Sequence, residues 1–235
     1  MQREQKLVKT GGYYFLRKAI RVEGTIDLFI NFFNMGNINK AAWATETGKI
    51  FNGMVLYAIA GAVYGILDPI NSMASLASTL GVASGLGFLD VLCWIFLAGI
   101  IVAYILIFKG LAGFKTILAP ADGNAIGKVR TSYILLLVAA AVDFIPLLGW
   151  VSSILYIIGF IMMLGAYSKL KNSATFPTDA RSGASLLFIS LILLVVGAVL
   201  GFIPLIGGWF NMVFSIIAYI LTFLGWNKIK NASVE

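Results

Sequence analysis

The Lys and Arg residues of this chain gather in four stretches, which are separated by long segments that contain neither residue. The 17 basic residues are divided into eight in 1–50, four in 109–130, three in 168–183 and two in 228–230. The segments without them are 51–108, 131–167 and 184–227. Basic residues beside membrane spans are retained on the cytoplasmic side. If each intervening segment crosses a membrane twice, every basic residue falls on that side, and both termini are expected to be cytoplasmic.

The composition excludes an ordinary soluble domain. Hydrophobic residues make up 60% of the chain and charged residues 11%, whereas soluble domains are about half apolar and a quarter charged. We therefore predict an all-α, polytopic integral membrane protein with about six transmembrane helices, arranged as three tandem hairpin repeats. The expected location is the cytoplasmic (inner) cell membrane, as a multi-pass protein whose main partner is the lipid bilayer.

Three regions are expected along the chain. They are a cytoplasmic or interfacial segment (1–50), a membrane domain (51–230, with hairpins at about 51–109, 131–167 and 184–227) and a cytoplasmic tail (231–235). Within 12–36, apolar residues at helical spacing favour an amphipathic helix lying in the membrane interface. The polar stretch 70–88 is expected to be the one long outer connection.

Two stretches of sequence resemble each other and indicate an internal repeat. Residues 139–149 are AAAVDFIPLLG and residues 197–207 are GAVLGFIPLIG, and a Trp closely follows each. Residues 61–69, which end in Asp-Pro, are a weaker echo. A unit with two crossings predicts parallel repeats related by an axis along the membrane normal. Proline near the far end of the first helix in each unit, including Pro69, is expected to terminate that helix.

Three carboxylates are the candidate functional side chains. Asp68, Asp90 and Asp143 lie at or near the predicted outer turns, without any Lys or Arg beside them. Asp143 lies inside an apolar stretch, where an ionisable residue is a functional hypothesis by default. The three could form a cation-attracting mouth of an ion or solute site. Alternatively, the outer side lacks cations only because the positive-inside rule excludes them.

Small residues four positions apart are candidate helix-packing residues. Gly61 and Gly65 in the first hairpin match Gly197 and Gly201 in the third. Such residues let helices approach each other closely in lipid. They serve either packing within this chain or association with another subunit.

Several kinds of chemistry lack the residues that they need. The chain has no His and a single cysteine, Cys93, so zinc, iron–sulfur and His-ligated haem sites are not expected. It has no phosphate-binding glycine loop and no evident nucleophile–base pair. We therefore expect no enzymatic activity and no cofactor. The net charge of +7 is explained by membrane topology, so no nucleic acid partner is expected.

These observations leave three functional hypotheses. The first is an accessory or structural subunit that packs in a membrane assembly with other subunits or in a homo-oligomer, because helix-packing features outnumber polar groups within the spans. The second is a small ion or solute channel or transporter that uses Asp143 with Asp68 or Asp90. The third is a hairpin-type membrane-shaping protein. The stretch 70–88 argues against the third, because it would then lie in hydrocarbon.

Overall fold

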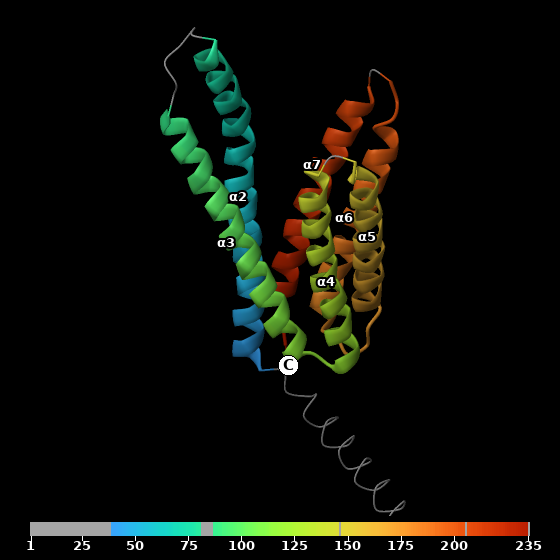
Figure 1. The fold of residues 1–235 in the computed structure, drawn as a ribbon. Helices are drawn as coiled ribbons and strands as arrows, with labels where there is room; N and C mark the ends of the chain where they lie inside the picture. The colour runs from blue at the N-terminus through green and yellow to red at the C-terminus, as the bar shows by residue number, and fades with distance from the viewer. Residues whose placement is uncertain (1–38, 81–86, 146, 205, 235) are drawn as a thin grey trace, which may run out of the picture. The chain divides into compact units, whose positions relative to one another are not determined.

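The computed structural model describes residues 39–234 apart from 81–86, 146 and 205. These residues contain no strand and form six α-helices: α2 (Lys40–Thr79), α3 (Gly87–Ile117), α4 (Pro120–Asp143), α5 (Gly149–Lys171), α6 (Thr178–Leu200) and α7 (Gly207–Lys230) (Figure 1). All six are long and apolar enough to cross a membrane, so the chain is compatible with a multi-pass integral membrane protein. The interfacial helix predicted over 12–36 lies outside the described residues.

The helices pack as three consecutive hairpins, α2 with α3, α4 with α5 and α6 with α7 (Figure 1). Further contacts join α3 to α4, α5 to α6 and α7 back to α2. The three hairpins therefore close a ring, in which every helix contacts both of its neighbours. That the hairpins are copies of one repeated unit remains a prediction.

Helix α2 begins earlier than the sequence indicates. The side-chain oxygen of Asn39 accepts hydrogen bonds from the backbone N–H groups of Ala41 (3.0 Å) and Ala42 (3.2 Å). This arrangement is an N-cap, which satisfies donors that the first turn of a helix leaves free. Residues 40–50 consequently belong to the first helix, although the sequence places the start of the membrane domain at residue 51.

The prediction that Pro69 terminates the first helix is wrong. Pro69 lies inside α2, which continues to Thr79, so much of the predicted connection 70–88 is helical. An interior proline removes one backbone hydrogen bond and costs roughly 3 kcal/mol. Packing against α3 offsets this cost, and just past the proline the side-chain amide of Asn71 donates a 2.7 Å hydrogen bond to Asp90 of α3.

The second and third hairpins reverse direction where the repeated Phe-Ile-Pro-Leu motif predicts. Residues 144–148 separate α4 from α5, and residues 201–206 separate α6 from α7. A side chain on Gly207 would collide with the carbonyl oxygen of Gly201, so the third reversal requires glycine there. In the second reversal, Leu147 has a φ of 73°, a conformation that is strained for residues other than glycine.

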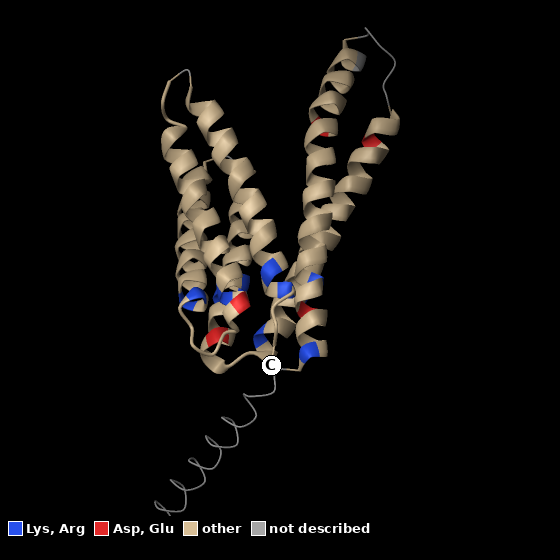
Figure 2. Cartoon of the chain, turned by 180° about the vertical axis from the view of Figure 1, so that it is seen from behind, with Lys and Arg blue, Asp and Glu red and all other residues tan. Residues whose placement is uncertain are grey.

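The Lys and Arg residues that the structure describes lie at one end of the helical bundle, where Figure 2 shows them in blue. Helices α2, α4 and α6 begin at this end, and α3, α5 and α7 finish there. We name it the basic end. That the basic end faces the cytoplasm remains a prediction.

The first hairpin extends farther from the basic end than the third. The rings of Phe51 in α2 and Phe223 in α7 are 4.9 Å apart, so these residues lie at similar depth. From there α2 rises about 42 Å to Thr79, whereas α7 rises about 24 Å to Gly207, at 1.5 Å per residue. A helix tilt of about 20° shortens α2 by only about 3 Å. We name the protruding part, residues 68–79 with 87–91, the outer extension.

Candidate functional site

An aromatic cluster fills the centre of the bundle at the basic end. Trp43 of α2 has ring centroids 4.8 Å from Phe114 of α3 and 5.8 Å from Phe176, which follows α5. Each of the three side chains is at most 1% exposed. The indole nitrogen of Trp43 donates a 2.9 Å hydrogen bond to the backbone oxygen of Ile229 in α7. One tryptophan therefore contacts all three hairpins.

Two carboxylates close the second and third hairpins at the same end. Asp122, in the first turn of α4, accepts a 2.6 Å hydrogen bond from the hydroxyl of Thr175, which follows α5. Asp179, in the first turn of α6, accepts a 2.5 Å hydrogen bond from the hydroxyl of Ser233, which follows α7. Each aspartate follows a proline by two residues, Pro120 and Pro177 respectively, and each ties the start of its hairpin to the segment that follows the hairpin.

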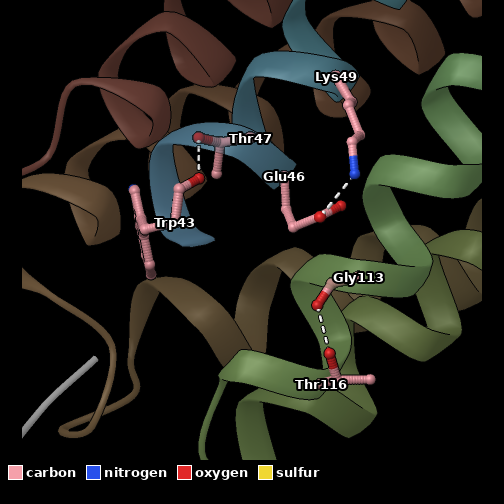
Figure 3. A network of polar contacts seen from close by, with 6 residues as sticks. All are labelled: Trp43, Glu46, Thr47, Lys49, Gly113 and Thr116. Atoms are coloured by element: carbon pink, nitrogen blue, oxygen red, sulfur yellow. Dashed lines mark hydrogen bonds and ion pairs between the residues drawn. The ribbon is translucent and has the colours of Figure 1, made fainter. Parts of the chain in front are cut away.

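A third carboxylate, Glu46 of α2, lies against α3 (Figure 3). Its Oε1 atom is 2.7 Å from Lys49 Nζ, and the carboxyl group fills the space that a side chain on Gly113 would need. Among the described residues, no group hydrogen-bonds to its buried Oε2 atom. The nearby hydroxyls of Thr47 and Thr116 donate to carbonyl oxygens of their own helices. Glycine at position 113 therefore makes room for an ion pair at this helix contact.

Farther from the basic end, the six helices surround a cavity of about 270 Å³. Its lining is mainly apolar, and none of the described residues that line it is charged. Every helix contributes a hydroxyl-bearing residue; in chain order they are Tyr57, Tyr104, Tyr133, Tyr167, Ser190 and Tyr219. Tyr167 is 2% exposed, whereas Tyr219 is 65% exposed. The cavity wall is therefore buried at Tyr167 and reaches the surface of the bundle at Tyr219.

Six of the seven hydroxyl-bearing residues that line the cavity form one pair on each hairpin, and Tyr219 is the seventh. The pairs are Tyr57 with Tyr104 on the first hairpin and Tyr133 with Tyr167 on the second, and Ser190 with Thr222 on the third, which are hydrogen-bonded. The first two rings form a T-shaped contact with centroids 5.3 Å apart, and the oxygens of the last pair are 3.0 Å apart. Each phenol group carries one hydroxyl proton, so each tyrosine pair brings two hydroxyl donors to the cavity wall.

The three outer aspartates are each bonded within their own hairpin. Asp68 accepts from the hydroxyl of Tyr64 (3.1 Å), Asp90 from the amide of Asn71 (2.7 Å), and Asp143 from the hydroxyl of Ser152 (3.2 Å). Within the described part of the chain, no group of three or more His, Cys, Asp and Glu residues could hold a metal ion. An acidic mouth built from these three aspartates remains a prediction.

The four glycines singled out in the sequence have different surroundings. A Cβ at Gly197 would lie 2.8 Å from the Cβ of Phe214 in α7, and a Cβ at Gly201 would lie 3.5 Å from that of Asn211. A Cβ at Gly61 or Gly65 would meet no described atom within 4 Å. Gly61 and Gly65 therefore face space that a partner could occupy. A packing role for all four remains a prediction.

The outer extension exposes large apolar side chains. Met73 is 74% exposed, Leu76 is 62% exposed and Phe88 is 61% exposed. The only charged residues of the outer extension are Asp68 and Asp90. Contiguous apolar surface that lies outside a membrane or a core is typical of an interaction site.

No sequence motif identifies the cavity tyrosines in advance, although their positions carried a signal. Five of the nine tyrosines of the chain line the cavity, and three of them, Tyr57, Tyr104 and Tyr219, lie inside the predicted spans rather than at the membrane interface, where tyrosine is enriched. No protein-family model, no curated protein and no solved structure matches the chain. We therefore infer function from the cavity and the outer extension.

Proposed function

We propose that this chain is a non-enzymatic membrane protein that serves as a subunit of a membrane assembly and binds a different membrane protein along the first hairpin. The outer extension carries the proposal, because α2 rises about 15 Å farther than α7 after its tilt is allowed for. The hydrocarbon core of a bilayer is about 30 Å thick. Helices of 23 or 24 residues in the other two hairpins suffice to cross it. Lipid tails therefore do not cover the apolar side chains of the outer extension.

One face of α2 runs from the membrane into the outer extension. Gly61, Gly65, Pro69, Ser72 and Leu76 recur at helical spacing, and none of them is buried. The two glycines permit a second helix to approach closely. This face, which we name the α2 face, suits a long helix of a partner that spans the membrane and projects on the same side.

Charge favours a different protein over a second copy of this chain. Two copies that meet through the outer extension would bring Asp68 and Asp90 of each copy close to those of the other. Like charges placed together across an interface cost up to several kcal/mol. A partner with basic or neutral polar groups at this depth avoids that repulsion.

Photocrosslinking in the native membrane tests this proposal. A photoreactive amino acid at Ser72 or at Leu76 should give an adduct with the same second polypeptide. At Ile161 of α5, which is 61% exposed, it should give no such adduct. Both α2 positions lie on the α2 face, whereas Ile161 is on another hairpin, so the comparison separates docking from random collision.

A blocking substitution tests whether the adduct depends on close helix approach. Gly65→Ile should abolish the Leu76 adduct, because the added side chain fills the α2 face. Gly165→Ile is the matched control, since a Cβ at Gly165 of α5 also meets no described atom within 4 Å. Adducts only with a second copy of this chain, or adducts that survive Gly65→Ile, would refute the proposed partner.

A further inference from the structure

The cavity surrounded by the six helices has the size, lining and hydrogen-bonding groups of a ligand site. We propose that it binds a small neutral amphipathic molecule, a phenol or alcohol of roughly ten non-hydrogen atoms. The inference does not depend on the proposed partner, because the cavity is lined by all six helices, whereas the partner is proposed to dock on the first hairpin.

Its volume limits the size of the ligand. A cavity of about 150 Å³ lined by apolar residues accommodates benzene, and drug-sized molecules occupy pockets that begin at about 300 Å³. The present cavity, at about 270 Å³, lies between these cases. An empty space of this size deprives its walls of dispersion contacts, which a ligand would restore.

The lining determines the charge of the ligand. None of the described residues around the cavity carries a charge, and an unpaired ion in such surroundings is strongly disfavoured. The walls instead combine aromatic rings with the flexible thioethers of Met54 and Met163. Thioethers and aromatic rings make favourable contacts with each other and with a flat apolar body.

The tyrosine pairs supply the polar contact. The cavity-lining phenols of both pairs, Tyr57 with Tyr104 and Tyr133 with Tyr167, each carry one hydroxyl proton that they can donate. Donors in an apolar site are costly unless an acceptor meets them. A ligand oxygen provides that acceptor, whereas a lipid acyl chain does not. Ser190 is already engaged, because its hydroxyl donates to the carbonyl oxygen of Leu187 (2.7 Å) and accepts from Thr222.

Photoaffinity labelling of the full chain in lipid nanodiscs tests the site. The probe is a benzyl alcohol that carries a trifluoromethyl diazirine, and the corresponding benzoic acid, which is anionic at neutral pH, is its matched control. We expect the alcohol to label Tyr219 and neighbouring cavity residues, and an excess of 4-ethylphenol to lower this labelling about tenfold. The acid should label Tyr219 no more than it labels Ile161 on the outer surface.

Substitutions separate binding from general stability. Thr222→Phe places a ring inside the cavity and should abolish labelling of Tyr219, whereas Ser153→Phe makes the same kind of change at an exposed position of α5 and should not. Tyr57→Phe keeps the volume, removes one hydroxyl and should weaken the competition by 4-ethylphenol, even if Thr222→Phe does not fold. Equal labelling of Tyr219 and Ile161 by the alcohol, equal labelling of Tyr219 by the alcohol and the acid, or unchanged binding in Tyr57→Phe would overturn the proposal.

Discussion

At the scale of single residues, glycine determines how closely two helices approach. Gly183 of α6 and Gly225 of α7 face each other near the basic end, and a Cβ at Gly183 would lie 2.5 Å from the carbonyl oxygen of Gly225. A backbone atom cannot rotate away as a side chain can. Any larger residue at position 183 therefore forces α6 and α7 apart.

Gly183→Ala should destabilise the folded chain by about 1–3 kcal/mol, which is the usual cost of overpacking. Gly61→Ala is the control and should not destabilise the chain. No described atom lies within 4 Å of its Cβ position, and alanine favours a helix over glycine by about 0.5–1 kcal/mol. Thermal unfolding in mild detergent, followed by circular dichroism, measures both variants. Equal melting temperatures would mean that α6 and α7 do not approach each other this closely.

The contact between Gly183 and Gly225 could not be predicted from the sequence. Gly197 and Gly201 attract attention because four residues separate them on one helix, whereas Gly183 and Gly225 lie on two helices and form no motif. Spacing along one helix shows which residues share a face. It does not show which neighbour that face meets or at what depth.

At the scale of helices, hydrophobicity predicts where the chain crosses the membrane better than where each helix ends. All six predicted crossings correspond to helices that are long and apolar enough to span a membrane, but α2 passes through Pro69 into a polar segment. Composition alone indicates a loop there. The helix persists because α3 packs along it, as the Asn71–Asp90 hydrogen bond shows, and such support from another element is not visible in the local sequence.

Pro69→Ala should therefore stabilise the chain, by up to about 3 kcal/mol, because alanine restores the backbone N–H that an interior helix position needs. Pro120→Ala is the matched control, since Pro120 is the first residue of α4. Proline suits that position, and its replacement should change stability by less than about 0.5 kcal/mol. Thermal unfolding of the two variants measures both changes in stability. A larger gain for Pro120→Ala would show that α2 does not continue through residue 69.

At the scale of the whole molecule, the ring of hairpins creates a site that no single segment encodes. The cavity tyrosines extend from Tyr57 to Tyr219 and belong to five helices. Their convergence depends on the rotation and depth of each helix, and neither follows from hydrophobicity. The sequence instead draws attention to Asp68, Asp90 and Asp143, each of which is bonded within its own hairpin.

Orientation is also a property of the whole molecule, and two exposed positions test it. Ser75→Cys lies in the outer extension and Ala121→Cys at the basic end, each introduced after the buried Cys93 is replaced by alanine. If the basic end is retained in the cytoplasm, an impermeant maleimide should label only Ser75→Cys in intact cells. After permeabilisation it should label both. Labelling of Ala121→Cys alone would reverse the orientation. Protection of both until lysis would place the hairpin tips within the membrane, as a membrane-shaping protein requires.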